Sequence, residues 1–285
     1  MALNITPVTN HREREKGLIV YPVYSRRSEG LSIGINLFLE RKICPFDCPY
    51  CEVFPFSSDM EFSHETMERE LRAALASAQE QKVRVRDICF SGNGEPSLSP
   101  FFPEALKRAG RIRAETVPGA ELVLITNGSG LLEPGIFSLL RDAAFSLNLN
   151  IWLKADAGTP DWYGKMNCSE IPFEKLIQKI REFSACAPVT IQTMICKADG
   201  KEPPPEEARA WVSLITELAA GTGTGLRKVQ IYGKARPAPE DPKTEALPAK
   251  YLEERAASLR SSLDKNAALS KSGALAKVPP VEVYP

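Results

Sequence analysis

The sequence predicts an α/β fold: a partial (β/α)6 TIM-like barrel, with a parallel sheet inside and helices outside. Two observations predict it. Six strand-like segments alternate with helix-like segments along the chain, which is typical of a parallel sheet covered by helices. One of these segments, Leu147–Lys154, alternates apolar and polar side chains, whereas a central strand of a flat, doubly wound sheet is apolar on both faces. A polar face suits a barrel interior that holds a polar ligand.

The elements follow one another in a regular order. Proline stands at or near the start of several predicted helices, where it fits the first turn. The predicted strands are Ser32–Phe38, Asp87–Ser91, Glu121–Thr126, Leu147–Lys154, Val189–Cys196 and Lys228–Tyr232. The predicted helices are Ser63–Gln79, Pro100–Ile112, Pro134–Ala143, Pro172–Phe183, Pro205–Leu218 and Pro248–Leu263.

The length of the chain suits one large α/β domain, and we expect a single domain over residues 1–285. The barrel core should cover about residues 30–235. Residues 236–285 should add a C-terminal loop, a helix and a tail.

The composition is that of an ordinary globular protein. Lys+Arg and Asp+Glu both number 36, and this zero net charge does not favour a nucleic-acid partner. Residues 1–17 lack the apolar core of a signal peptide, and no apolar stretch is long enough to cross a membrane. The seven cysteines therefore indicate a reducing, cytoplasmic compartment rather than a disulfide framework.

Three cysteines carry the strongest chemical signal. Cys44, Cys48 and Cys51 have a C-x3-C-x2-C spacing, with Tyr50 just before the last one. Three thiolates on one loop can bind three irons of a cubane cluster and leave the fourth iron open for chemistry. The alternative is a set of structural cysteines or part of a zinc site, but zinc ligands more often come as two C-x2-C pairs, and no second pair is present.

Two further segments follow predicted strands. Gly92, Asn93, Gly94 and Glu95 lie directly after the second strand, where two glycines let the backbone approach a ligand closely. A purely structural turn is the alternative for this segment. Thr126 and Asn127 end the third strand, and their side chains can bond a ribose or a carboxylate; a simple turn before Gly128 explains them equally well.

Polar residues also follow the later strands. Lys154 and Asp156 end the fourth strand. Buried lysine needs a partner, so Lys154 could neutralise a ligand carboxylate, bind an acidic substrate or act as a base; a solvated ion pair with Asp156 is the alternative. Gln230 and Tyr232 share one face of the sixth strand, which we expect to face the barrel interior and a bound ligand; a salt bridge at the barrel rim is the alternative for this strand end.

Together these motifs resemble the radical S-adenosylmethionine (SAM) enzymes. The resemblance covers residues 25–240, and its most specific parts are the cysteine loop and Ser91–Pro96. The segment Ser25-Arg26-Arg27, followed by Ile33–Leu37, most resembles the small radical SAM proteins related to the wyosine-base tRNA-modifying enzymes. Those enzymes have cysteines upstream of the triad for a second cluster, and this chain has none before Cys44.

The resemblance implies a site and cofactors. Cys44, Cys48 and Cys51 are implied as ligands of a [4Fe-4S] cluster, and SAM as the second cofactor. From their positions at strand ends, we expect Lys154, Asp156 and Tyr232 to be the catalytic residues. The implied SAM-binding residues are Tyr50, Gly92, Asn93, Gly94, Glu95, Thr126, Asn127, Lys154 and Gln230.

The implied reaction is reductive cleavage of SAM to a 5'-deoxyadenosyl radical, which abstracts hydrogen from a substrate. The implied partners are a flavodoxin- or ferredoxin-type electron donor and a small-molecule, peptide or RNA substrate. Three other functions stay open: a wyosine-type tRNA base modifier, an activating enzyme for a glycyl-radical protein, and a non-catalytic iron–sulfur binding protein.

Overall fold

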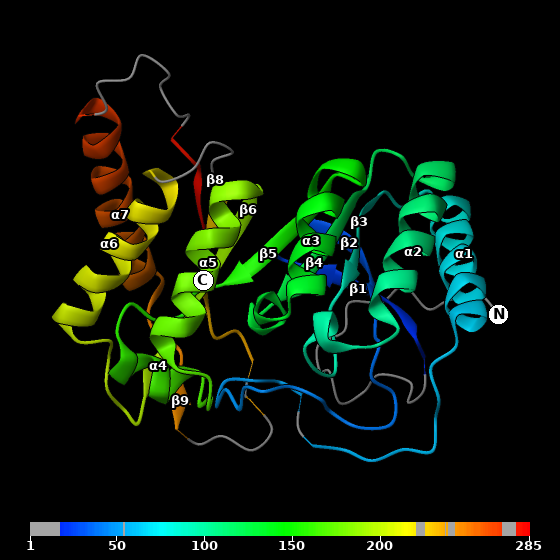
Figure 1. The fold of residues 1–285 in the computed structure, drawn as a ribbon, viewed down its shortest axis with the longest axis horizontal. Helices are drawn as coiled ribbons and strands as arrows, with labels where there is room; N and C mark the ends of the chain where they lie inside the picture. The colour runs from blue at the N-terminus through cyan, green and yellow to red at the C-terminus, as the bar shows by residue number, and fades with distance from the viewer. Residues whose placement is uncertain (1–17, 54, 221–225, 237, 239–242, 270–277) are drawn as a thin grey trace. The chain divides into compact units, whose positions relative to one another are not determined.

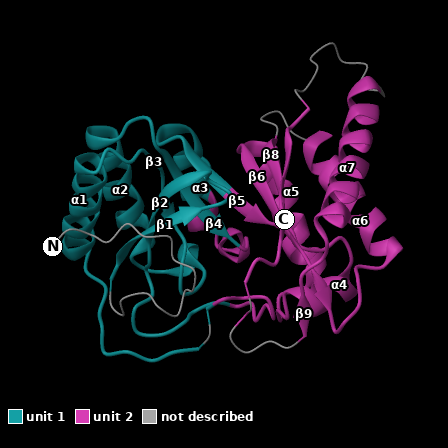
Figure 2. Cartoon of the chain, turned by 180° about the vertical axis from the view of Figure 1, so that it is seen from behind, with its two compact units in different colours: residues 1–44, 53–126, 138–151 teal, residues 45–52, 127–137, 152–285 magenta. Residues whose placement is uncertain are grey.

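The computed structural model describes residues 18–53, 55–220, 226–236, 238, 243–269 and 278–285. The chain divides into two compact units, which Figure 2 colours separately. Unit 1 comprises residues 1–44, 53–126 and 138–151, and unit 2 comprises residues 45–52, 127–137 and 152–285. The single domain over residues 1–285 stays a prediction. The segment predicted to lack a signal peptide, residues 1–17, lies outside the described residues.

Unit 1 contains a mostly parallel sheet and the helices that connect its strands (Figure 1). Strand order in its part of the sheet is β1-β2-β3-β4, and the first half of β5 continues it. β1 is antiparallel to β2, whereas β2, β3 and β4 are parallel, with Ile33 opposite Ile88. Its elements are β1 (Val20–Ser25), β2 (Gly30–Ile35), α1 (His64–Glu80), β3 (Val85–Phe90), η2 (Pro96–Leu98), α2 (Phe102–Thr116), β4 (Glu121–Thr126), α3 (Pro134–Ser146, shared) and β5 (Leu149–Lys154, shared).

The core of unit 1 explains why these segments form. Ile33, Ile88 and Phe90 are fully buried on the strands, and α1 begins where Ser63 accepts a hydrogen bond from the Thr66 N–H. Phe90 meets Phe102 of α2 edge to face, with ring centres 5.5 Å apart. Burial of each such side chain contributes roughly 1.5–3 kcal/mol, which fixes α2 against β3.

In unit 2, the strand order runs from the second half of β5 through β6, β8 and β10. β6, β8 and β10 are parallel, and Gln230 of β8 lies opposite Gln192 on one side and Glu282 on the other. α6 and α7 pack side by side (Figure 1). Its elements are η3 (Ser129–Leu132), α4 (Pro160–Met166), α5 (Phe173–Cys186), β6 (Val189–Ile195), β7 (Lys197–Ala198), α6 (Pro205–Ala220), β8 (Leu226–Gly233), β9 (Thr244–Glu245), α7 (Ala249–Leu269) and β10 (Val281–Tyr284).

All six predicted strands and all six predicted helices are present, and the α/β class is confirmed. The predicted alternation from Leu147 is shorter than expected, because Asn148 has a left-handed φ of 48° and the strand begins at Leu149. Strands β1 and β10 and helix α4 were not predicted. No helix in the described part of the chain combines the length and the apolar character that a membrane crossing demands.

Candidate functional site

In unit 1, the glycine segment packs against the residues that lead into the cysteine loop. Gly94 forms a parallel bridge with Ile43, and the Glu95 N–H donates to the Ile43 carbonyl at 2.8 Å. A β-carbon added at Gly94 would lie 2.1 Å from that carbonyl oxygen, so only glycine allows this approach. Cys44 follows Ile43 directly, and the glycine segment therefore sets the start of the cysteine loop.

Glu95 is the centre of a buried hydrogen-bond group. Its Oε1 accepts from the Thr126 hydroxyl at 2.7 Å and from the Ser97 hydroxyl at 2.6 Å. The Ser97 N–H donates to the same oxygen, and Glu95 is 2 % exposed. The structure thus brings together two predicted site residues, Glu95 and Thr126, from the ends of β3 and β4.

Asn36 belongs to the same region of unit 1, although sequence reasoning did not single it out. Its Oδ1 accepts from the Phe38 N–H at 3.1 Å and from the Asn93 N–H at 3.3 Å. The Asn93 side chain in turn donates to the Phe38 carbonyl at 3.2 Å. Sequence reasoning placed Asn36 within the predicted strand Ser32–Phe38, whereas β2 ends at Ile35, so no signal marked this residue.

In unit 2, Cys48 and Cys51 lie across a tight turn in which the Cys51 N–H donates to the Cys48 carbonyl at 2.9 Å. The loop is fastened to the residues after α4. The Asp47 N–H donates to the Asn167 carbonyl at 3.1 Å, and the Ser169 hydroxyl donates to the Pro45 carbonyl at 3.1 Å. Sequence reasoning missed Asn167, and nothing in its local sequence marks it.

The end of β5 holds a buried polar centre in unit 2. Lys154 forms an ion pair with Asp156 at 3.2 Å and a short hydrogen bond with the Tyr232 hydroxyl. The Tyr50 hydroxyl donates to Asp156 Oδ2 at 2.5 Å, and the Met194 N–H donates to Oδ1 at 2.9 Å. The Lys154 Nζ lies 5.0 Å from the ring centre of both tyrosines. All three predicted catalytic residues meet here, together with the aromatic residue of the cysteine loop.

The electrostatics of this centre follow from its burial. Burial opposes the charge on Lys154, but the Asp156 carboxylate and Tyr232 outweigh it, so the pKa of Lys154 rises. Burial and the Asp156 carboxylate raise the pKa of Tyr50 well above its usual range. Burial, followed by the same carboxylate, raises the pKa of the Cys48 thiol to about 12. A charged Lys154 favours anion binding over the role of a neutral base.

The two remaining predicted site residues of unit 2 are Asn127 and Gln230, which make separate contacts. The Asn127 Oδ1 accepts from the Ser129 N–H at 2.9 Å, which is the turn geometry considered above. Gln230 is fully buried: it accepts from the Gln192 amide at 2.6 Å and donates to Glu282 Oε2 at 3.0 Å.

Glu282 of β10 completes this network. Burial works to raise its pKa, but hydrogen bonds from Gln230 and Tyr284, and the charge of Lys228, outweigh burial and lower it. The ionised carboxylate is therefore the favoured form beside Gln230.

The donor set suits an iron–sulfur cluster. All seven cysteines are free of disulfides, and the three loop cysteines are half-buried. In the described parts of the chain, no three Cys, His, Asp or Glu side chains gather closely enough to hold one metal ion. Each thiolate of a cubane binds a different iron, and three cysteines on one loop can supply three such ligands.

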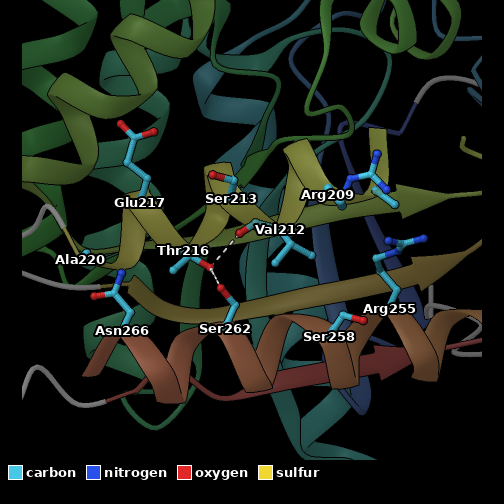
Figure 3. A pocket seen from close by; sticks show the side chains of 11 residues that line it. Arg209, Val212, Ser213, Thr216, Glu217, Ala220, Arg255, Ser258, Ser262 and Asn266 are labelled. Atoms are coloured by element: carbon cyan, nitrogen blue, oxygen red, sulfur yellow. Dashed lines mark hydrogen bonds between the residues drawn. The ribbon is translucent and has the colours of Figure 1, made fainter. Parts of the chain in front are cut away.

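A hollow of unit 2 lies elsewhere, along α6 and α7. This open groove has a volume of about 560 Å³ and is lined mainly by small and polar side chains (Figure 3). The Thr216 hydroxyl spans it, donating to the Val212 carbonyl at 2.8 Å and bonding the Ser262 hydroxyl at 2.9 Å. None of the predicted site residues lines it, so the chemistry points to the end of β5 instead.

Comparison with known proteins identifies the family. Residues 42–205 match the family model described as the radical SAM superfamily. Among curated proteins, the chain is similar to UPF0026 proteins from two strains of Helicobacter pylori. One is 29 % identical over 177 residues and the other 28 % identical over 172 residues. These matches cover 60 % and 59 % of this chain but only 53 % and 52 % of those proteins, so the chain spans about half the length of the curated relatives it matches.

Three solved structures have a similar fold. A radical SAM methyltransferase from Sphaerobacter thermophilus has a TM-score of 0.62 at 15 % identity, covering 92 % of this chain and 68 % of that one. Archaeal TYW1 has a TM-score of 0.50 at 14 % identity, covering 82 % and 72 %. The FeFe-hydrogenase maturase HydG from Carboxydothermus hydrogenoformans has a TM-score of 0.53 at 14 % identity, covering 87 % and 57 %. At these identities the likeness shows the fold, and it confirms the predicted partial TIM-like barrel.

The family match covers more than half of the 285 residues. It confirms the predicted enzyme class and the predicted cofactors, a [4Fe-4S] cluster and SAM. The chain belongs to the radical SAM superfamily.

Proposed function

We propose that this enzyme cleaves SAM reductively to a 5'-deoxyadenosyl radical, which abstracts a hydrogen atom from its substrate. The observation that carries the proposal is the polar centre of unit 2. Tyr50, from the cysteine loop, donates to Asp156, which pairs with Lys154 at the end of β5. The cysteine loop and a buried ammonium group are thereby linked through one carboxylate.

Cys44, Cys48 and Cys51 are the residues that would hold three irons of the cluster. When bound, the cluster supplies one electron to the sulfonium of SAM and an open iron for its amino and carboxylate groups. The hydrogen bonds that anchor Asp47 and Pro45 support this assignment, because they fix the backbone that leads into the turn at Cys48.

Each unit carries predicted SAM-binding residues of its own. In unit 1, Gly92, Asn93, Gly94 and Glu95, with Thr126, present backbone and side-chain groups at strand ends, where ligands of barrel enzymes collect. In unit 2, we assign the same task to Tyr50, Asn127, Lys154 and Gln230. Their role is orientation, since selective cleavage of one C–S bond requires a fixed geometry.

Lys154, Asp156 and Tyr232 would act on the substrate. The ammonium of Lys154 stays protonated beside Asp156, so it would bind a carboxylate or another anionic group. Tyr232 bonds Lys154 through its hydroxyl and would hold that ammonium in place. Asp156 keeps the local charge balanced before an anion arrives.

The test is anaerobic. The protein is reconstituted with iron and sulfide, mixed with SAM and dithionite, and the nucleoside products are identified by mass spectrometry. We expect 5'-deoxyadenosine from the wild type and none from Cys48→Ala. Cys186→Ala is the matched control, because Cys186 ends α5 outside the triad; it should match the wild type. Methylthioadenosine as the product, or cleavage that persists in Cys48→Ala, would contradict the proposal.

The substrate is a small molecule, a peptide or an RNA. Candidates can be tested by whether they stimulate this cleavage of SAM. A flavodoxin- or ferredoxin-type protein is the proposed physiological electron donor. We also propose the cytoplasm as the compartment, because free cysteines and a reducible cluster both require reducing conditions.

A further inference from the structure

We propose that Asn167 tunes the reduction potential of the cluster by donating a hydrogen bond to the sulfur of Cys48. This inference rests on the proposed function, since it assigns Cys48 to the cluster. Asn167 is then a positioning residue, because it acts on the cluster through the sulfur of Cys48.

Asn167 is held in place by its backbone. It caps the C-terminus of α4, with its N–H donating to the Tyr163 carbonyl at 2.9 Å, and it is 2 % exposed. Its carbonyl accepts the Asp47 N–H at 3.1 Å, one residue before Cys48. Two backbone hydrogen bonds therefore fix the amide side chain beside the cysteine loop.

Both N–H groups of the Asn167 side-chain amide point to acceptors in the same region. Asn167 Nδ2 lies 3.6 Å from Cys48 Sγ and 3.0 Å from Asp156 Oδ2. A carboxylate oxygen only accepts hydrogen bonds. The amide oxygen would be repelled by Asp156, so the nitrogen must point to this side and its second N–H faces the sulfur.

Asp156 is itself held by four groups, which fixes the direction of the Asn167 amide. It accepts from Tyr50 and Asn167 through Oδ2, and from the Met194 N–H and the Lys154 ammonium through Oδ1. Its side chain has no exposed surface. The carboxylate thus orients a neutral donor toward the sulfur, as groups beyond the direct ligands of a metal commonly do.

A second contact disappears when Cys48 binds iron. The Cys48 thiol lies 3.9 Å from the Asn167 carbonyl, a contact that depends on the thiol proton. A thiolate ligand has lost that proton. The Nδ2 donor remains, and a hydrogen bond to a ligand sulfur stabilises the more negative, reduced cluster. Asn167 should therefore raise the reduction potential.

The test is a redox titration of the reconstituted full chain, without SAM, followed by the EPR signal of the reduced cluster. Asn167→Leu removes both side-chain N–H donors and keeps a side chain of similar volume. We expect its cluster to have a more negative reduction potential than that of the wild type. Ser169→Ala is the matched control: it removes the 3.1 Å anchor to Pro45 but no donor to sulfur, and its potential should equal that of the wild type.

Each outcome decides the question. An unchanged or more positive potential in Asn167→Leu overturns the inference, as does an equal shift in Ser169→Ala. If Asn167→Leu holds no cluster, Asn167→Met provides the same measurement. If both variants lose the cluster while Ser169→Ala retains it, Asn167 acts in cluster assembly, and the proposal that it tunes the reduction potential is overturned. A wild type that forms no cluster, or does not cleave SAM, contradicts the proposed function instead.

Discussion

Gly94→Ala tests whether the close approach of the glycine segment to Ile43 matters. The new β-carbon would lie 2.1 Å from the Ile43 carbonyl oxygen and 2.8 Å from the Phe38 ring. Ordinary van der Waals contacts begin at 3.4 Å, so the Ile43 carbonyl must retreat by about 1.3 Å to reach one. That movement breaks the 2.8 Å hydrogen bond from the Glu95 N–H.

The magnitude follows from two contributions. Loss of the hydrogen bond costs about 1 kcal/mol, and overpacking typically costs about 1–3 kcal/mol. We therefore expect Gly94→Ala to lower the free energy of unfolding by about 2–4 kcal/mol. Because Cys44 follows Ile43, the variant should also bind less iron and sulfide on reconstitution.

The assay is urea unfolding followed by circular dichroism, with iron and sulfide counted per chain after reconstitution. Gly135→Ala is the control, because a β-carbon at Gly135 meets nothing within 4 Å and the residue lies in α3. Alanine in a helix is favoured over glycine by about 0.5–1 kcal/mol, so this variant should match or exceed the wild type. If Gly94→Ala unfolds like Gly135→Ala and holds as much iron, the reasoning is refuted.

Three other variants probe the buried charges. Thr126→Val removes the donor to Glu95 and should cost about 1.5–3 kcal/mol of unfolding free energy and weaken SAM binding; unchanged SAM affinity by equilibrium dialysis would count against a role in binding. Lys154→Met leaves Asp156 without its cation and should cost about 3–5 kcal/mol, read from the urea midpoint; a midpoint equal to that of the wild type would show that the pair is not structural. The pKa of Glu282 is lowered from 4.5 in the folded state, so its contribution to stability is present above pH 4.5 and is lost as the pH falls through the folded-state pKa. Glu282→Gln should reduce this loss of stability at acid pH. An acid-unfolding profile identical to that of the wild type would contradict the stabilising role of the Glu282 carboxylate.

The repeating units of the fold were predictable because their signals are local. Each long strand and helix shows its own pattern, and β3 and β4 end in the glycine and threonine segments that the sequence singles out. Helix α4 was missed because it has only seven residues, although Thr159 caps it and Pro160 opens it. β10 was missed because its four residues become a strand only by pairing with β8.

The site was predictable in its residue types but not in its connections. The cysteine spacing indicates cluster chemistry without any structure. The hydrogen bond from Tyr50 to Asp156, and that from Asn167 to Cys48, join residues 106 and 119 positions apart. Such contacts depend on how β5 and α4 pack in unit 2, which no local pattern encodes. Sequence reasoning therefore named Asp156 but missed Asn167.

The separation between Cys48 and Asn167 also has a consequence for biosynthesis. Chains are made at about 5–20 residues per second, so the cysteine loop leaves the ribosome roughly 6–24 s before the residue that anchors it. Through that interval Cys48 has neither the neighbouring amide nor the burial that raises its thiol pKa in the folded state. The nascent Cys48 thiol is therefore more reactive before folding than after it, and the yield of intact protein should depend on how well oxygen is excluded during translation rather than only during purification.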